Sequence, residues 1–98
     1  MSTKIVTVIG LGFVGLPTAC VLANTKKKKK SIFSVHGIDK DINTIKNKIF
    51  NANKYSEDIK LNKLIKLLPQ NKSFSLTKNY KSIIKSDTII ISVGFDFN

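Results

Sequence analysis

The sequence lacks arginine and tryptophan, and its 98 residues include one cysteine, one histidine and six acidic residues. A lone cysteine forms no intrachain disulfide, which excludes a small disulfide-held secreted protein and favours a reducing, cytoplasmic compartment. Without arginine, the chain has no side chain that clamps phosphate or guanine with two parallel hydrogen bonds. The short length excludes two domains of ordinary size.

The positive charge comes entirely from lysine. All 17 cationic residues are lysines, and the formal net charge is +11 at pH 7. The chain also has 14 isoleucines and 9 asparagines, which indicates a compositional bias in which lysine is the default surface residue. Net charge supports non-specific association and says nothing of fold or chemistry. We therefore expect no nucleic-acid partner.

A long stretch from Ile5 to Thr25 contains no charged residue and is flanked by lysines. A membrane-spanning helix needs about 20 predominantly apolar residues. This stretch instead includes three glycines and Pro17, and its β-branched first half gives way to a different pattern. We therefore expect no membrane association, and we interpret the stretch as a strand, a turn and a helix.

Apolar runs and periodic patterns predict four strands that alternate with helices. Continuous apolar runs are typical of buried parallel strands, and an i, i+3, i+4, i+7 spacing is typical of amphipathic helices. The predicted strands are residues 4–9, 33–39, 74–77 and 88–93. The predicted helices are residues 13–23, 42–49 with Asp41 as the cap, 61–68 and 80–85.

This alternation predicts an α/β fold with a Rossmann-like parallel sheet and right-handed crossovers. We expect the strand order 3-2-1-4 with helices on both faces, an incomplete half of a doubly wound domain. The fourth strand, residues 88–93, would then be an exposed apolar edge. Self-association through this edge follows as an expectation.

Five consecutive lysines at residues 26–30 can bury nothing and repel one another. We interpret them as a solvated loop between the first helix and the second strand. The functional alternative is a patch that binds phosphate or a membrane surface.

The sequence places Gly10-x-Gly12-x-x-Gly15 directly after a predicted strand and at the start of a predicted helix. In this arrangement Gly10 permits the tight turn, Gly12 lets the main chain approach a pyrophosphate, and Gly15 lets the helix pack on the sheet. The amides of Phe13 and Val14 would then point at the anion. The motif predicts a dinucleotide site.

An acidic residue at the end of the second strand strengthens this prediction. The dinucleotide fingerprint places such a residue about 20 positions after the glycines, where it accepts hydrogen bonds from the ribose. Asp39 meets that spacing if the lysine run is an inserted loop. A carboxylate there repels a 2′-phosphate, so we expect NAD rather than NADP, although Lys40 beside it works against this preference.

Other reactive residues have simpler structural interpretations. Cys20 falls within the first helix and is expected to be a small core residue. His36 lies in the middle of a strand and is expected to be structural or to face solvent. Glu57 and Asp58 are favourable charges near a helix N-terminus. No cluster of histidines and cysteines is present to hold a metal ion.

The run Lys-Ile-Val-Thr-Val-Ile-Gly-Leu-Gly-Phe-Val-Gly-Leu-Pro-Thr-Ala at residues 4–19 resembles the opening of the UDP-glucose/GDP-mannose dehydrogenase family. Its Gly-Leu-Pro-Thr-Ala ending is most similar to UDP-N-acetyl-D-mannosamine dehydrogenases. The resemblance continues at residues 35–39 and 86–93, and it spans nearly the whole chain.

The resemblance implies an NAD-dependent enzyme that oxidises the C6 hydroxyl of a nucleotide sugar to a carboxylate, for synthesis of surface polysaccharide. It implies that Phe13, Val14 and Asp39 contact the cofactor, as would Val93 and Gly94 after the fourth strand. Residues 93–96 are Val-Gly-Phe-Asp, whereas the family usually has Val-Pro-Thr-Pro or Val-Gly-Thr-Pro there.

Members of that family are much longer, and their catalytic residues and sugar-binding domain follow the matched region. We therefore expect residues 1–98 to be a truncated N-terminal dinucleotide-binding domain, without catalytic residues or a substrate domain. The full-length parent would be a homo-oligomer that binds a nucleotide sugar.

Two alternatives stay open. The first is another NAD-dependent oxidoreductase or epimerase that shares only the Rossmann start. The dehydrogenase family requires a distant cysteine in a glycine-containing motif downstream, and this alternative does not. The second is a small basic module that binds nucleotides or nucleic acid. Salt-dependent DNA binding without NAD binding would favour this second alternative.

Overall fold

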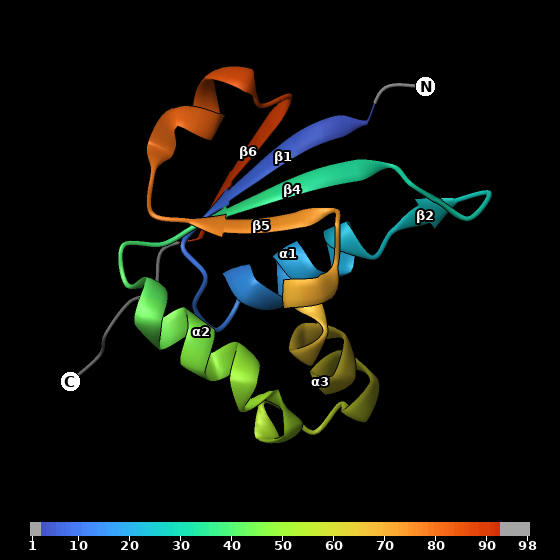
Figure 1. Cartoon of the computed structure of the whole chain (residues 1–98), viewed down its shortest axis with the longest axis vertical. Coiled ribbons are helices and arrows are strands. Elements are labelled where there is room, and N and C mark those ends of the chain that lie inside the picture. The colour runs from blue at the N-terminus through green and yellow to red at the C-terminus, as the bar shows by residue number, and fades with distance from the viewer. Residues whose placement is uncertain (1–2, 93–98) are drawn as a thin grey trace.

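The computed structural model describes residues 3–92, in which a four-stranded parallel sheet packs against three α-helices (Figure 1). The sheet order is β5-β4-β1-β6. Its strands are β1 (Lys4–Ile9), β4 (Phe33–Ile38), β5 (Phe74–Thr77) and β6 (Thr88–Ile91). These are the four strands of the sequence prediction, and their order is the predicted 3-2-1-4.

Strand β1 lies in the middle of the sheet because its run of apolar and β-branched residues suits burial on both faces. It pairs in parallel with β4 on one side and with β6 on the other. Val6 and Val8 point into the core on the face of the sheet that the α-helices cover, whereas Thr7 between them is buried on the opposite face. The carboxyl ends of β1 and β4 therefore lie side by side.

Three α-helices, α1 (Gly15–Ala23), α2 (Ile42–Phe50) and α3 (Ile59–Lys66), cover one face of the sheet (Figure 1). Asp41 caps α2 by accepting a hydrogen bond from the Thr44 amide at 3.3 Å, as the sequence predicts. Asp58 caps α3 in the same way through the Leu61 amide at 3.1 Å. Both caps fix where the helices begin.

The hydrophobic core lies between this face and the helices. It joins alternate residues of the strands to the inner faces of α1, α2 and α3. The buried members are Val6, Val8, Leu11, Leu16, Ala19, Cys20, Ala23, Val35, Ile45, Ile49, Ala52, Ile65 and Leu68.

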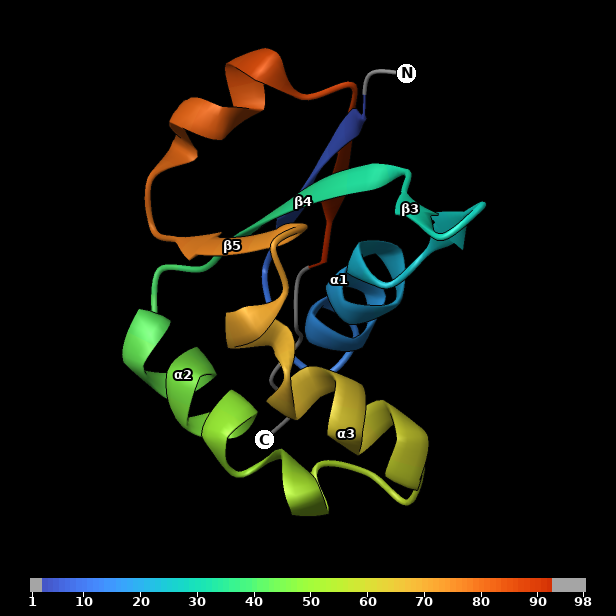
Figure 2. The same cartoon turned by 45° about the vertical axis from the view of Figure 1, so that its right-hand side comes forward.

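The opposite face is covered more thinly. The crossover from β5 to β6 passes over it as the 3₁₀ helix η3 (Tyr80–Lys85), which Figure 2 shows on the other side of the sheet from α1, α2 and α3. The Thr7 hydroxyl bonds that of Ser86 just after η3, while Ile84 is 88% exposed. Helices therefore lie on both faces, but the element at residues 80–85 is a tight 3₁₀ segment.

Several predicted boundaries are wrong by a few residues. Helix α1 begins at Gly15 rather than at Phe13, because residues 12–14 form the turn that enters it. Helix α3 ends at Lys66, and the chain continues as the 3₁₀ helix η2 (Leu68–Gln70), since Pro69 lacks the amide that would extend α3. Strand β6 ends at Ile91.

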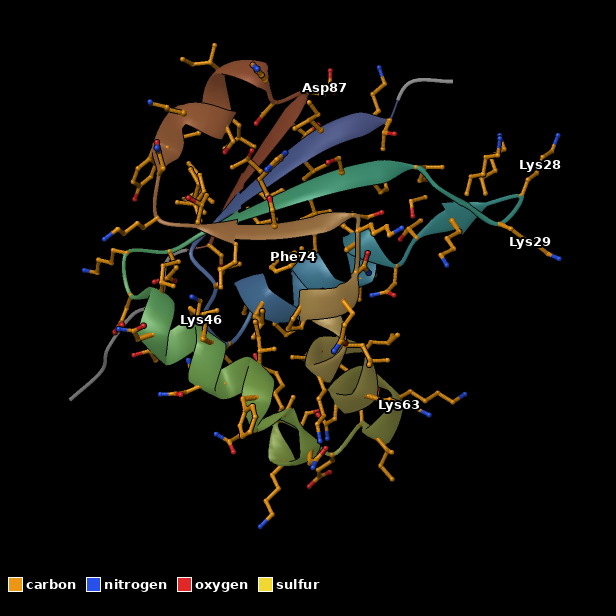
Figure 3. The ribbon with its side chains drawn as sticks, in the orientation of Figure 1. Lys28, Lys29, Lys46, Lys63, Phe74 and Asp87 are labelled. Atoms are coloured by element: carbon orange, nitrogen blue, oxygen red, sulfur yellow. The ribbon has the colours of Figure 1, made fainter. Side chains whose placement is uncertain are left out.

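The lysine run is exposed as predicted, but it is not an irregular loop. It forms an antiparallel hairpin of two short strands, β2 (Lys26–Lys27) and β3 (Lys30–Ser31). Lys28 and Lys29 form its two-residue turn with φ of 52° and 67°, the sign that a type I′ turn requires at both positions. Figure 3 shows both side chains at the tip of the hairpin. We call residues 26–31 the lysine hairpin.

The helices within residues 3–92 are too short or too polar for any of them to cross a membrane.

Candidate dinucleotide-binding site

The turn after β1, residues 10–15, is the glycine turn, and main-chain contacts fix its shape. Gly10 has φ of +89°, and a Cβ built on it would lie 1.9 Å from the carbonyl oxygen of Ser92. A Cβ on Gly15 would lie 1.7 Å from the carbonyl oxygen of Gly10. Both glycines are therefore required by the fold, Gly10 for the turn and Gly15 for the close approach of α1 to that turn.

Leu11 anchors the glycine turn to β4 in two ways. Its side chain is fully buried and lies over Gly37, where an added Cβ would come within 2.8 Å of Leu11 Cδ1. Its amide donates a 2.8 Å hydrogen bond to Oδ2 of Asp39. The other carboxylate oxygen of Asp39, Oδ1, accepts from the Asp41 amide at 2.8 Å. The Asp39 side chain is thus turned toward the glycine turn.

Gly12 differs from the other two glycines of the motif. A Cβ built on it would meet no heavy atom within 4 Å among the described residues, and its φ lies outside the left-handed region. The fold thus does not require a glycine at this position. A ligand that approaches the main chain closely would require glycine here, because a side chain would occupy the same space.

The amides that follow Gly12 are free to bind an anion. Within residues 3–92, the amides of Phe13 and Val14 donate no hydrogen bond, and no side chain caps α1. The side chains of Phe13 and Val14 are 85% and 63% exposed. Free amides at a helix N-terminus attract anions because the helix dipole adds to their own. The open space at Gly12 and these amides fit a diphosphate.

Asp39 and Lys40 lie at the end of β4, beside the glycine turn. Asp39 is half-buried and Lys40 is exposed. A carboxylate offers about four lone-pair directions, of which the Leu11 and Asp41 amides use two, so the group can still accept from ribose hydroxyls. Val93 and Gly94, also predicted as cofactor contacts, lie outside the described residues.

Sequence reasoning missed one residue at this site, Tyr55. Its hydroxyl lies 3.5 Å from the carbonyl oxygen of Gly12 and 3.4 Å from that of Phe13. Burial of the phenol raises the pKa of Tyr55, so the hydroxyl keeps its proton at neutral pH. The contact joins residues 43 positions apart in the chain, and no local sequence pattern signals it.

The other reactive side chains have no position in the site. Cys20 is fully buried inside α1, and this burial raises the pKa of its thiol to about 11, which disfavours the nucleophilic thiolate. The His36 ring bonds the Ser75 hydroxyl on the neighbouring strand at 2.8 Å. No group of three His, Cys, Asp or Glu side chains within the described part of the chain could hold a metal ion.

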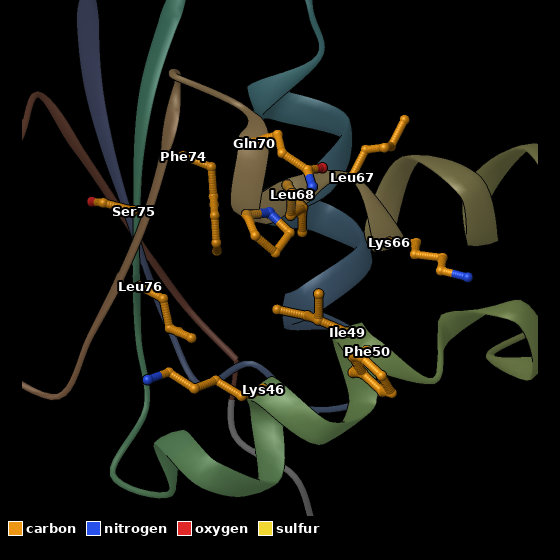
Figure 4. A pocket seen from close by; sticks show the side chains of 11 residues that line it. Lys46, Ile49, Phe50, Lys66, Leu67, Leu68, Gln70, Phe74, Ser75 and Leu76 are labelled. Atoms are coloured by element: carbon orange, nitrogen blue, oxygen red, sulfur yellow. The ribbon is translucent and has the colours of Figure 1, made fainter.

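A separate cavity of about 700 Å³ opens between α2, η2 and β5 (Figure 4). Its lining is mostly apolar and includes Ile49, Leu68, Phe74 and Leu76, with Lys46 at one side. No residue of the glycine turn contributes to this lining. The cavity is therefore distinct from the dinucleotide-binding site.

Comparison with known structures supports the fold. The crystal structure of NDP-N-acetyl-D-galactosaminuronic acid dehydrogenase from Methanosarcina mazei Go1 matches 98% of this chain, with a TM-score of 0.72 and 23% sequence identity. The match covers 20% of that chain, so the present sequence spans about a fifth of its length. No match was found among curated protein sequences.

Comparison with family models identifies the sequence more closely. The model of the NAD-binding domain of the UDP-glucose/GDP-mannose dehydrogenase family matches residues 4–97. That range includes all four strands of the parallel sheet, the glycine turn and Asp39. The chain therefore belongs to the UDP-glucose/GDP-mannose dehydrogenase family and corresponds to its NAD-binding domain.

Proposed function

We propose that the chain binds NAD at the glycine turn, with the diphosphate over Gly12 and the adenosine ribose at Asp39. The observation that supports this most directly is that, among the described residues, the space at Gly12 is open and the adjacent amides of Phe13 and Val14 donate no hydrogen bond. Gly10 and Gly15 keep the turn in shape, and Val93 and Gly94 would complete the cofactor contacts. Lys40, which directly follows Asp39 and is exposed, is included in the proposal as a contact of the same ribose.

The proposal specifies NAD rather than NADP. The Asp39 carboxylate lies at the end of β4, and each of its oxygens accepts one hydrogen bond from an amide. Its remaining lone pairs can accept hydrogen bonds from ribose hydroxyls. A 2′-phosphate would bring a second negative group to the same place and would be repelled. Lys40 is exposed and offsets part of this repulsion.

In the parent enzyme, the bound NAD would accept hydride as a nucleotide sugar is oxidised from the C6 alcohol to the carboxylate. The ending of the glycine motif, residues 15–19, favours a UDP-N-acetyl-D-mannosamine dehydrogenase within the family. The described residues provide cofactor binding and no nucleophile, since Cys20 is buried within α1. We therefore expect the isolated 98-residue chain to bind NAD without oxidising a sugar.

Self-association is the second part of the proposal. Within the described residues, β6 pairs with β1 along one edge only. Ile89 and Ile91 on this strand are 42% and 67% exposed. An apolar edge strand with unpaired backbone groups favours pairing with another chain. We expect sedimentation velocity of the isolated chain to show dimers or larger species, and a monomer at all concentrations would contradict this.

Calorimetric titration of NAD and NADP into the chain tests the cofactor assignment. We expect saturable binding of NAD at one site, and NADP binding at least about tenfold weaker because of charge repulsion at Asp39. Equal dissociation constants would overturn the preference for NAD. Absence of NAD binding, together with salt-dependent DNA binding, would favour a basic nucleic-acid-binding module instead.

A further inference from the structure

Tyr55 reaches the glycine turn from a segment that the dinucleotide motif does not include. It follows the 3₁₀ helix η1 (Ala52–Lys54) in the connection between α2 and α3. Its ring packs against the hydrophobic core, and its hydroxyl lies within 3.5 Å of the carbonyl oxygens of Gly12 and Phe13. One phenolic proton thus faces two successive peptide groups of the turn.

A buried asparagine on α3 holds this segment in place. Asn62 is 5% exposed. Its Oδ1 accepts from the amide of Ser56 at 2.9 Å and from the Ser56 hydroxyl at 3.0 Å. Its Nδ2 donates to the carbonyl oxygens of Ser56 at 2.8 Å and Asn53 at 3.2 Å. These four bonds use the full hydrogen-bonding capacity of the side chain, and they hold the chain on both sides of Tyr55.

The two carbonyls that Tyr55 contacts belong to the same peptide groups as the two free amides of the site. A trans peptide is planar, and its C=O and N–H point in opposite directions. The Gly12 carbonyl therefore fixes the direction of the Phe13 amide, and the Phe13 carbonyl fixes that of the Val14 amide. A hydroxyl on the carbonyl side leaves both amides turned away from Tyr55.

We propose that Tyr55 is a positioning residue for the cofactor: held by Asn62, it orients the Phe13 and Val14 amides toward the diphosphate. This inference rests on the proposed function, because it requires a diphosphate at Gly12. It adds the connection between α2 and α3 to a site that otherwise consists of the glycine turn and the end of β4. The hydroxyl acts through the main chain and does not itself contact the anion.

The Tyr55→Phe variant tests the proposal because it removes the hydroxyl and keeps the ring in the core. We expect the dissociation constant for NAD to rise about 3- to 10-fold, the effect of losing one neutral hydrogen bond. Tyr80→Phe is the matched control, since Tyr80 lies on η3 and is 53% exposed. We expect this control to bind NAD as the wild type does.

A second measurement separates positioning from a general loss of stability. In the absence of NAD, ¹⁵N relaxation should show lower order parameters for the Phe13 and Val14 amides in Tyr55→Phe than in the wild type. The amides of β1 and of α1 beyond its first turn should keep order parameters of about 0.85, as in a rigid backbone. A drop that spread over the whole sheet would indicate a structural role and would contradict the proposal.

The two proposals fail in different ways. If the wild type does not bind NAD, the proposed function is overturned, and the Tyr55 proposal with it. If the wild type binds NAD and Tyr55→Phe binds it equally well, the proposed function stands and the role of Tyr55 is overturned. Unchanged order parameters in Tyr55→Phe would also overturn that role.

Discussion

Within residues 3–92, two turns contain residues with positive φ, and their surroundings are opposite. Gly10 has φ of +89° and is enclosed by the Ser92 carbonyl, so even one methyl group is excluded. Lys28 and Lys29 have φ of 52° and 67° in the exposed tip of the lysine hairpin. The same backbone feature is therefore a packing requirement at the glycine turn and a tolerated local strain at the hairpin.

The two turns also lie at opposite ends of the sheet. The glycine turn follows the carboxyl end of β1, where ligands bind in open parallel sheets. The lysine hairpin precedes the amino end of β4. The glycine turn lies at the carboxyl end of the sheet, so the six residues of β4 separate the two turns by about 20 Å. Of these two turns, the glycine turn is the one that lies beside main-chain amides and the Asp39 carboxylate, which are groups that can bind a ligand.

The largest expected effect is that of Gly10→Ala, which tests the enclosed turn. The new methyl group would overlap the Ser92 carbonyl, and alanine disfavours φ of +89°. We expect a loss of about 3 kcal/mol or more in the free energy of unfolding, a large part of the stability of a small domain. Urea unfolding followed by circular dichroism measures it, with Gly12→Ala as the control. An unchanged midpoint for Gly10→Ala would show that the fold does not require glycine at this turn.

Asp39→Asn should have a smaller effect, on both stability and cofactor choice. One of the two backbone amides that Asp39 binds would lose its acceptor, which costs about 1 to 3 kcal/mol. The lost charge should also bring the NAD and NADP dissociation constants closer together. Urea unfolding and calorimetry with both cofactors measure these effects. A variant that still rejects NADP as strongly as the wild type would show that Asp39 does not set the preference for NAD.

At the lysine hairpin, replacing both turn residues should be mildly stabilising. Lys28 and Lys29 have left-handed backbone conformations that cost about 1 kcal/mol each, and replacing both by glycine removes this cost. Glycine also raises the conformational entropy of the unfolded chain, which offsets part of the gain in stability. We expect a net gain of about 1 kcal/mol or less by urea unfolding. A loss of stability of similar size would mean that the lysines make contacts which the exposed hairpin does not show.

The smallest expected effect is that of removing the hairpin charges. Replacement of all five lysines at residues 26–30 by glutamine should change the NAD dissociation constant less than about twofold at 0.15 M salt. The Debye length there is about 8 Å, well below the length of β4. Calorimetry at two salt concentrations measures this. A tenfold weaker affinity in the variant would show that the hairpin takes part in cofactor binding.

The sequence predicts much of this fold because its signals are local. The apolar run at residues 4–9 gives β1 with its observed bounds, and Asp41 marks the start of α2. The sequence alone predicts that the glycine turn and Asp39 lie side by side, because parallel strands end at one edge of the sheet.

The parts that the sequence does not predict depend on distant contacts or on weak local preferences. The lysine hairpin has no apolar alternation, so nothing in residues 26–30 indicates strand pairing. The 3₁₀ form of residues 80–85 is set by the crossover to β6 rather than by its composition. Tyr55 and Asn62 are single polar residues whose roles arise only when the connection between α2 and α3 packs against the glycine turn and α3.

A diphosphate site at Gly12 is tested most directly by comparing NAD binding and urea unfolding of the wild type with those of Gly12→Val. The space at Gly12 is open within the described structure, so the fold should tolerate the larger side chain with a change in unfolding free energy below about 1 kcal/mol. The same side chain would fill the place of the diphosphate and should weaken NAD binding at least about tenfold. A stable Gly12→Val variant that binds NAD as tightly as the wild type would show that the diphosphate does not bind over Gly12.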